Sequence, residues 1–524
     1  MPIVRSVSGS ESHDDHIGLS APELQRRALL GVSASTISST IALPLAIIVS
    51  AVLARSLGPQ EFARFAYLAF LVPLIVQLAD AGYAQATARW ASQAVASGDL
   101  STAGELAGKL VGWNFVRLPL VLGVILVVAQ PAPAVALAVV IFGVVASAGS
   151  GLVVALTAEN RVGTTAKLGF LQALAAGGVG VSAVLAGASG TTVWALSFAS
   201  GIVAAPGWFL TANPKLRLAA LRPRLPRQLP PGFWRFGLAA AAASAGYALV
   251  FSRSEVIILE MLGRHRALAV FALAYGLAQR LTTPIDTLLG PLIPALSGLR
   301  AAHPDRLRAG FERALRLSSA GVAFLGAAAV TGTMLAAPLL FGPEYVGIGP
   351  AFVALAAISL LQSAAQPYTA LAHALGRPGV TLAALVPALV VDVALSLALI
   401  PLFDLWGAII ANAAGALVAV GLTARAAAGR ASLRLAHIPG FSLAVLAVGS
   451  AGLAYAAAVA TAPVAPPASV ATAFAVGAVT FVLLAKAVGG VLPREDVEVL
   501  LGSLPTPIAN ASRGAVSLLA RKMS

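Results

Sequence analysis

Residues 274–296, AYGLAQRLTTPIDTLLGPLIPAL, form an apolar run of membrane-spanning length that nevertheless carries Arg280, Asp286 and three prolines. A span needs about 20 mostly apolar residues to cross a hydrocarbon core of about 30 Å. A charge at the centre of a span costs about 2.5–3.5 kcal/mol on insertion scales, so Arg280 and Asp286 should face protein or water. This run therefore predicts a membrane helix with a polar, functional face.

The composition of the whole chain is that of a membrane protein. Hydrophobic residues make up 59% of the 524 residues, charged residues make up 10%, and the mean hydropathy is +0.90. The apolar runs are continuous, whereas the strands of a β-barrel would alternate polar and apolar residues. The pattern predicts an α-helical bundle of fourteen spans: 28–54, 62–83, 107–129, 133–157, 166–187, 190–211, 235–261, 268–297, 315–340, 348–373, 379–402, 405–428, 438–461 and 467–491.

The net charge of +14 could suggest binding to nucleic acid, but the placement of the basic residues argues against it. With the N-terminus inside, most of the 34 Lys and Arg residues fall in the two tails and the inner loops. The outer loops hold Arg55, Arg64, Arg264 and Arg266. This distribution follows the positive-inside rule. It predicts a multi-pass protein of the inner (cytoplasmic) membrane with both termini in the cytoplasm.

The motifs of soluble enzymes are missing from the sequence. The chain has no cysteine, no phosphate-binding loop and no nucleophile elbow, and it has no soluble domain longer than a loop. We therefore expect a transporter and not an enzyme, with no metal site and with a coupling ion as the one candidate cofactor. The alternative from another class is a membrane-embedded glycosyltransferase or polymerase, which should carry a large outer loop. The predicted outer loops are only a few residues long.

An internal repeat divides the predicted spans into two halves. Asp80 and Asp286 occupy equivalent positions in these halves, as do Asp99 and Asp305. Six spans precede the first long basic segment, so both halves start on the inner side, related by an axis along the membrane normal. The expected order is a polar tail 1–27, an N-lobe 28–211, a basic linker 212–234, a C-lobe 235–428, two further helices within 438–491, and a tail 492–524 that forms either an interfacial helix or a frayed end.

Several stretches carry a family resemblance. They are ARSLGPQEFARFAYLAFLVPLIVQLADAGYAQATARW (54–90), SRSEVIILEMLGRHRALAVFALAYGLAQRL (252–281), LFGPEYVGIGPAFVALAAISLLQ (340–362), ALGRPG (374–379) and LIPLFDLWGAIIAN (399–412). Over most of residues 28–430 the chain resembles the oligosaccharide (Wzx-type) flippases of the MOP exporter superfamily. The resemblance implies a V-shaped bundle with two lobes around a central cleft. It implies transfer of a polyprenyl-diphosphate-linked saccharide from the inner to the outer leaflet, with membrane lipid and glycosyltransferases or a polymerase of the same pathway as partners.

Two relatives of these flippases are alternatives. The lipid II flippases are similar in fold, but their motif after the first helix continues into an Arg-Asp pair, where this chain reads Leu57-Gly58-Pro59-Gln60-Glu61-Phe62. The MATE-type drug exporters share the fold and usually have twelve helices. The two additional helices predicted within 438–491 therefore favour a lipid-linked cargo.

Cationic and polar side chains within the spans are candidates for binding the cargo. The predicted substrate-binding residues are Arg280, Arg117, Arg253, Gln279 and Thr283. Arg280 and Arg117 are predicted at similar depth in opposite lobes, where they could grip a diphosphate from both sides. The planar guanidinium suits this role because it binds phosphate oxygens in pairs and keeps its charge when desolvated. In the alternative, Arg280 is neutralised by Asp392 and touches no ligand.

A second set of polar residues is predicted to bind a coupling ion. Glu255, Asp392 and Asn412 lie at similar depth on helices 7, 11 and 12, and this trio of helices resembles the cation site in the C-lobe of some superfamily members. We expect a Na⁺ or H⁺ site with Asp392 as its central carboxylate, since hard cations prefer oxygen ligands. An ion pair of Asp392 with Arg280 or Arg253 is the alternative.

Asp80 and Asp286 are candidates for a gate. Both are predicted near the cytoplasmic boundary, where they could pair with loop cations such as Arg89 and Arg300. We expect them to brace the inner mouth of the cleft when it is closed. The alternative is that each carboxylate anchors a loop in every conformation.

Overall fold

The computed structural model describes most of the chain. The described residues are 21–289, 292, 296, 299–300, 306–375, 379–430, 440–463, 465–488, 490–503, 510, 513–514 and 516–520. Their side chains are described from residue 43 onward, except for residues 162, 252–253, 287–288, 428–430, 440–441 and 499–500. Helices dominate this part of the chain, and the β-structure found in it is one isolated bridge between Leu492 and Ala520.

The helices fall into two halves joined by a short helix and followed by a C-terminal group. The first half contains α1 (Ala21–Asp80), α2 (Tyr83–Ala96), α3 (Leu100–Ala129), α4 (Pro133–Ala158), α5 (Val162–Leu185), α6 (Gly190–Ala199), the 3₁₀ segment η1 (Ser200–Ala204) and α7 (Ala205–Thr211). The joining helix is α8 (Pro214–Leu221). The second half contains α9 (Phe233–Ala248), the π-helical segment η2 (Leu249–Arg253), α10 (Ser254–Met261), α11 (His265–Leu289), α13 (Leu307–Phe341), α14 (Ile348–Ala374), α15 (Gly379–Phe403) and α16 (Leu405–Arg430). The C-terminal group is α17 (Gly440–Thr461), α18 (Pro466–Ala487) and α19 (Arg494–Ser503).

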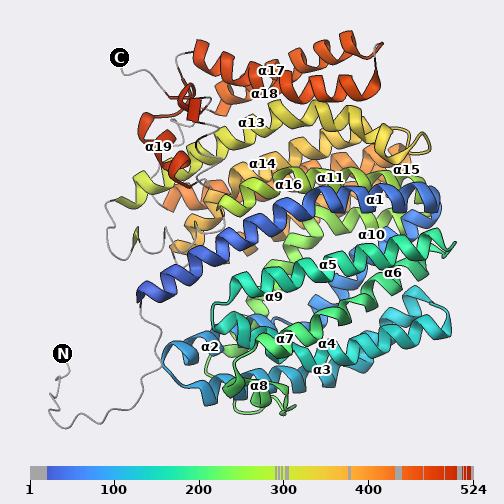
Figure 1. The fold of residues 1–524 in the computed structure, drawn as a ribbon, viewed down its shortest axis with the longest axis vertical. Helices are drawn as coiled ribbons and strands as arrows, with labels where there is room; N and C mark the ends of the chain where they lie inside the picture. The colour runs from blue at the N-terminus through green and yellow to red at the C-terminus, as the bar shows by residue number, and fades with distance from the viewer. Residues whose placement is uncertain are drawn as a thin grey trace.

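The long element α1 is two antiparallel arms that meet at Gly58. Gly58 has φ 70° and ψ 170°, a left-handed backbone that favours glycine, and Pro59 follows it. The chain turns back at this point, so the second arm returns beside the first arm toward α2 (Figure 1). We call this end of the bundle the Gly58 end and the opposite end, where α1 begins and α19 lies, the tail end.

The helices account for the predicted spans. Twelve segments of the described chain are long and apolar enough to cross a membrane. One of them, Leu43–Asp80, contains both arms of α1 and so corresponds to two predicted spans. α11 is not among the twelve because residues such as Gln279 and Arg280 lower its hydropathy, but it also runs through the bundle beside α14. The prediction of a multi-helix membrane bundle is therefore confirmed, while the short helices α2, α8 and α19 were not predicted.

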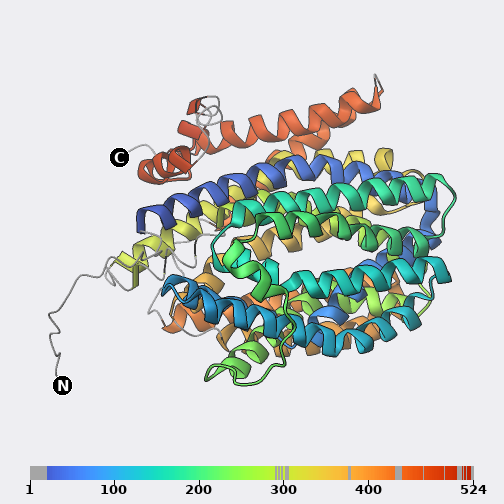
Figure 2. The same cartoon turned by 60° about the horizontal axis from the view of Figure 1, so that its bottom comes forward.

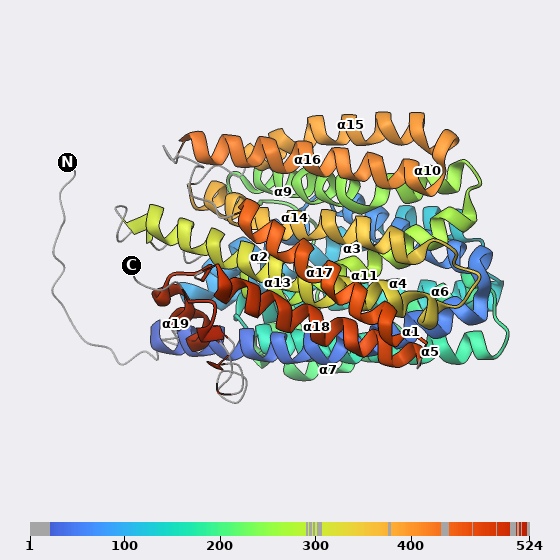
Figure 3. The same cartoon turned by 90° about the horizontal axis from the view of Figure 1, so that it is seen from above.

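The helices of each half pack mainly on one another. In the first half α1 packs on α5 and α6, and α3 packs on α4; in the second half α14 lies against α11, α13 and α16, and α15 pairs with α16. The halves meet where α1 contacts α11 and where α2 contacts α9. Figures 1 and 2 show α3 and α4 on the side of the bundle away from α17 and α18. Figure 3 shows α17 and α18 lying over α13, on which both pack.

A large hydrophobic cluster joins the two halves toward the Gly58 end. It contains Ala54 and Phe62 of α1, Phe271 of α11 and Phe341 of α13. Polar contacts reinforce it, because the Tyr345 hydroxyl donates to the Ala54 carbonyl oxygen at 2.7 Å. Aromatic and aliphatic burial of this kind fixes the approach of the halves at this end.

The contact between the halves toward the tail end is narrow and depends on glycine. A Cβ atom placed on Gly82 would lie 1.8 Å from the carbonyl oxygen of Gly237 on α9. Next to this contact, the Gln85 side-chain amide donates to the Ser244 hydroxyl at 3.2 Å. The close approach of α2 and α9 therefore requires the absence of a side chain at Gly82.

Candidate functional site

A buried polar cluster lies among α10, α15 and α16. Glu255, Asp392 and Asn412 have no solvent exposure. The Asn412 amide donates to Glu255 Oε1 at 2.7 Å and has a longer contact of 3.4 Å to the Val250 carbonyl oxygen. Val250 lies in the π-helical segment η2, whose i→i+5 pattern frees a backbone carbonyl for such a contact. The structure thus brings together the three residues predicted to bind a coupling ion.

The hydroxyl of Ser254 connects the two carboxyl groups of this cluster. Ser254 Oγ lies 2.8 Å from the Leu249 carbonyl oxygen and 3.1 Å from Glu255 Oε2, and it also contacts Asp392 Oδ2. A serine hydroxyl has one hydrogen to donate, so it cannot satisfy three acceptors. At least one of the two carboxyl groups must hold a proton or share a cation for both contacts to be attractive.

The cluster also contains oxygen atoms without a partner. Asp392 Oδ1, Asn412 Oδ1 and the hydroxyl of Ser396 are buried and make no hydrogen bond within the described part of the chain. No described Lys or Arg forms an ion pair with Glu255 or Asp392. Buried acceptors of this kind are costly unless a proton or cation joins them. Two carboxyl groups with an amide and hydroxyl oxygens fit a hard monovalent cation or a proton.

Arg280 does not neutralise Asp392, so the alternative with that ion pair is wrong. Its Nη2 instead donates to the Ser50 hydroxyl on α1 at 3.1 Å, across the contact between the two halves. Arg280 forms no ion pair in the described structure. The side chain of Arg253, the other proposed partner, lies outside the described residues. Arg280 is therefore a partly buried cation whose hydrogen-bond partner among the described residues is a neutral hydroxyl.

The other polar residues of α11 make neutral contacts. The Gln279 amide lies 3.4 Å from the Ser359 hydroxyl on α14, and the Thr283 hydroxyl donates to the Gln279 carbonyl oxygen at 3.0 Å. Pro284 follows within the helix. Gln279 and Arg280 therefore reach different neighbours from successive positions, and the predicted substrate-binding residues of α11 do not form one tight cluster.

Asp286 is held by neutral donors within the second half. It accepts hydrogen bonds from the hydroxyls of Thr282 at 3.0 Å and Ser363 at 2.8 Å, and from the Gln366 amide at 2.6 Å. The predicted pairing with Arg300 is wrong, because Arg300 Nη1 donates to the Ala374 carbonyl oxygen. Three donors can compensate a desolvated carboxylate without a cation.

Asp80 pairs with Arg117 within the first half. Asp80 Oδ1 lies 3.4 Å from Arg117 Nη2, and Arg117 also donates to Asn114 Oδ1 at 2.8 Å and to the Val76 carbonyl oxygen at 2.7 Å. The predicted pairing of Asp80 with Arg89 is wrong, because the guanidinium of Arg89 stacks on aromatic rings instead. Arg117 is therefore engaged by a carboxylate, whereas Arg280 is not.

Two pockets lie beside these aspartates. Asp80, Asn114 and Arg117 line a cavity of about 630 Å³ in the first half, whose walls are mostly apolar side chains of α1, α3 and α4. A second cavity, of about 310 Å³, lies in the second half and is lined by Gln362, Gln366 and residues of α15 and α16. Each half thus has a pocket whose lining includes an aspartate or a hydrogen-bond partner of one.

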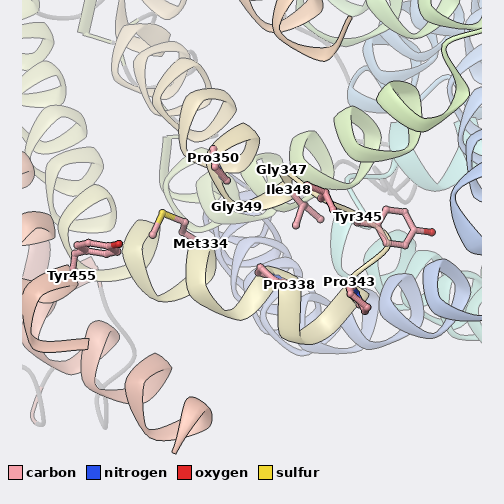
Figure 4. A pocket seen from close by; sticks show the side chains of 11 residues that line it. Met334, Pro338, Pro343, Tyr345, Gly347, Ile348, Gly349, Pro350 and Tyr455 are labelled. Atoms are coloured by element: carbon pink, nitrogen blue, oxygen red, sulfur yellow. The ribbon is translucent and has the colours of Figure 1, made fainter. Parts of the chain in front are cut away.

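A third cavity, of about 680 Å³, opens toward the Gly58 end among α13, α14 and α17 (Figure 4). Its lining is apolar and includes Met334 and Pro338 of α13 and Tyr455 of α17. Tyr345 contributes to the wall, while its ring points away from Tyr455 in Figure 4. None of the described residues that line this cavity is charged.

Several residues of these sites were not predicted from the sequence. They are Ser254 and Ser396 in the acidic cluster, Ser363 and Gln366 around Asp286, and Ser50 beside Arg280. Helical spacing could have indicated one of them. Ser396 follows the predicted Asp392 by four residues on the same helix, so the two share a helix face.

The fold is similar to that of several solved transporters. The lipid II flippase MurJ in an inward closed conformation gives a TM-score of 0.62 at 8% identity, covering 86% of this chain and 98% of that chain. An inward-facing multidrug resistance MATE family transporter of the MOP superfamily gives a TM-score of 0.56 at 15% identity, covering 76% of this chain and 98% of that chain. A MOP superfamily transporter from Pyrococcus furiosus gives a TM-score of 0.52 at 17% identity, covering 77% of this chain and 95% of that chain. The protein is thus a multi-pass membrane protein with the MOP-superfamily transporter fold.

The sequence comparison identifies the family. A family model described as polysaccharide biosynthesis protein matches residues 52–348, which is more than half of the chain. The chain belongs to this polysaccharide biosynthesis protein family. A search of curated proteins gives no match.

Proposed function

We propose that the protein is a flippase that moves a polyprenyl-diphosphate-linked saccharide from the inner to the outer leaflet of the cytoplasmic membrane. Membership of the polysaccharide biosynthesis family supports a saccharide cargo. The similarity in fold to the lipid II flippase MurJ over 86% of the chain supports a carrier of lipid-linked cargo.

The environment of Arg280 is the observation that carries the proposal. It is a partly buried cation at the contact of α1 with α11, with a neutral hydroxyl as its partner. In the proposed cycle the two halves separate at this contact and expose Arg280 to the diphosphate of the cargo. A bidentate guanidinium would then hold the phosphate oxygens. Arg117 would contribute a second cation only after leaving Asp80, because the ion pair engages it here.

The alternatives are a cation-coupled multidrug exporter and a lipid II flippase. A site for a cationic drug would need acidic and aromatic side chains, whereas Arg280, Ser50, Gln279 and Ser359 offer a cation and neutral polar groups. This chemistry favours an anionic cargo. It does not separate lipid II from another polyprenyl-linked saccharide, since both carry the same diphosphate.

The acidic cluster is proposed as the site that couples transport to Na⁺ or H⁺. Asp392 and Glu255 would hold the ion, with Asn412 and Ser254 as further oxygen donors. Two observations support this proposal. The single hydrogen of the Ser254 hydroxyl faces three acceptors, and one side-chain oxygen each of Asp392 and Asn412 has no hydrogen-bond partner in the described structure. A bound cation would supply positive charge that holds α10, α15 and α16 together, and its loss would allow them to move apart.

The tail end is proposed as the cytoplasmic end. The joining segment carries exposed basic residues such as Lys215, Arg222 and Arg227, and it packs on the part of α3 that begins at this end, in agreement with the positive-inside rule. A cytoplasmic tail end would also let the protein receive its cargo from glycosyltransferases of the same pathway.

The experiment that tests the proposal compares cargoes in proteoliposomes of the full chain. One set contains a fluorescent polyprenyl-diphosphate saccharide in the inner leaflet, another contains lipid II, and a third contains a cationic dye in the lumen. We expect the saccharide to become accessible to an added glycosidase faster than in protein-free liposomes. Efflux of the dye without translocation of either lipid would refute the proposal, and translocation of lipid II alone would favour the lipid II alternative.

A further inference from the structure

A row of glycines on α3 receives the segment that joins the two halves. Gly104, Gly108 and Gly112 are four residues apart and share one face of α3. A Cβ atom on Gly108 would lie 2.6 Å from the Arg222 carbonyl oxygen. One on Gly112 would lie 1.9 Å from the Arg224 carbonyl oxygen. The backbone of the segment therefore packs directly on the helix, as small residues permit in membrane proteins.

Hydrogen bonds hold the same segment at both of its ends. Arg161 Nη1 donates to the Thr211 carbonyl oxygen at 2.7 Å, where α7 ends. Lys109 Nζ donates to the Gln228 carbonyl oxygen at 3.1 Å, near the start of α9. Between these points, Arg224 N donates to the Gly108 carbonyl oxygen at 3.0 Å. The joining segment is thus a fixed part of the first half and not a loose tether.

The outward side of this segment combines free cations with exposed leucines. Lys215, Arg222 and Arg227 are exposed and form no ion pair within the described residues. Leu218 and Leu225 lie between them with 66% and 58% of their surface exposed. The opposite face of α8 is buried on α3 and α4. In Figure 2, α8 projects from the bundle beside α3.

We propose that residues 214–227 form a binding surface for the headgroups of anionic phospholipids in the inner leaflet. The proposal does not depend on the cargo and rests on the proposed cytoplasmic orientation of the tail end. Exposed leucines enter the boundary between headgroups and acyl chains, while lysine and arginine beside them attract phosphate. A soluble acidic protein would not account for two large apolar side chains placed between the cations. The glycine row fixes the cations in position, so little ordering is needed on binding.

The test counts the phospholipids retained by the purified full chain. The protein is exposed to mixed phosphatidylcholine and phosphatidylglycerol and analysed by native mass spectrometry. The variant Arg222→Gln/Arg227→Gln is compared with Arg308→Gln/Arg494→Gln, which removes two exposed arginines that are paired with Glu312 and Glu498. We expect the first variant to retain phosphatidylglycerol more weakly, by about fivefold for each removed cation, with phosphatidylcholine unchanged. The control variant should match the parent.

Three results would overturn the proposal. The first is equal retention of phosphatidylglycerol by both variants. The second is retention by the parent that does not weaken as salt is raised, which needs no variant to fold. The third is loss of activity in cells by the first variant with unchanged lipid retention, which would point to an acidic protein partner.

A separate measurement tests the orientation on which the proposal rests. The chain has no cysteine, so Leu218→Cys gives a single reactive thiol. Labelling of this thiol only from the cytoplasmic side of the membrane supports the orientation. Labelling only from the outer side would refute both the orientation and the inner-leaflet surface, whatever the cargo.

Discussion

Glu255 and Asp392 both contact the hydroxyl of Ser254, and neither is paired with a described basic side chain. One hydrogen on Ser254 cannot serve both carboxylates and the Leu249 carbonyl oxygen. The arrangement therefore depends on a proton or a cation that the side chains themselves do not supply. Such a pair titrates as a unit, so the role of each residue has to be tested through the other.

Asp392→Asn is expected to preserve folding and abolish ion dependence. The Asn amide can donate to an acceptor and so replaces the bound proton or cation, whereas Asp392→Leu removes the acceptor of Ser254. The transport rate of Asp392→Asn in proteoliposomes should not change across a range of pH and Na⁺ concentration. Transport that keeps the ion dependence of the parent would exclude the site. The folded yield of Asp392→Leu measures how much the cluster contributes to the stability of the fold.

Gly415→Ala is expected to destabilise the protein by displacing Asp392. A Cβ atom on Gly415 would lie 2.8 Å from Asp392 Cβ and 3.4 Å from the Ala388 carbonyl oxygen. Overpacking of this kind costs about 1–3 kcal/mol. Gly421→Ala on the same helix is the matched control, because it meets nothing within 4 Å. Thermal unfolding in detergent should therefore separate the two variants, and equal midpoints would contradict the packing.

Arg280→Ala is expected to lose translocation at normal folded yield, with Arg280→Lys restoring it only in part. A lysine keeps the charge but lacks the planar fork that binds two phosphate oxygens. Ser50→Ala removes the neutral partner of Arg280 and should leave translocation nearly intact. If Ser50→Ala loses transport as fully as Arg280→Ala, the arginine serves to join α1 to α11 and the cargo site must be sought elsewhere.

Asp80→Asn is expected to destabilise the first half more than Asp286→Asn destabilises the second. Asp80 is the carboxylate that pairs with Arg117, and its loss leaves a half-buried guanidinium without an ion-pair partner. Asp286 accepts from neutral donors, two of which an Asn oxygen can still satisfy. Unfolding midpoints test this difference. A role of either aspartate in an inner gate remains a prediction, and unchanged cysteine accessibility from the cytoplasmic side in both variants would count against it.

Gly82→Ala is expected to separate α2 from α9 and so open the tail end. Its Cβ would lie 1.8 Å from the Gly237 carbonyl oxygen, which leaves no room for a methyl group. Gly98→Ala is the matched control, because its φ of 80° is similar to the 74° of Gly82 but nothing lies within 4 Å. Both variants share the backbone strain, so only Gly82→Ala should raise the labelling of a cysteine introduced at Ser244. Equal labelling would indicate that the contact does not close this end.

Much of the fold could be predicted from the sequence because a bilayer constrains every span separately. Hydrocarbon requires long apolar helices, and this requirement gives the positions of the helices without any knowledge of their packing. The same cost picks out Arg280, Asp286 and Asp392 as candidates for a functional role. Depth counted along each helix was enough to group Glu255 with Asp392, since both lie on helices that run side by side.

The partners of these charges were decided only by the tertiary structure. A depth counted along a helix ignores the tilt of the helix and the length of an arginine side chain. It therefore placed Asp80 and Arg117 at different depths in the membrane, although the two side chains form an ion pair. It also suggested a pairing of Arg280 with Asp392, whereas the rotation of α11 directs the guanidinium toward Ser50. Hydropathy indicates which segments are surrounded by lipid, but it does not indicate which side chains contact one another. Ion pairs, the shared hydroxyl of Ser254 and the glycine row of α3 depend on how helices rotate and cross, and that is set by side-chain packing between segments distant in the chain.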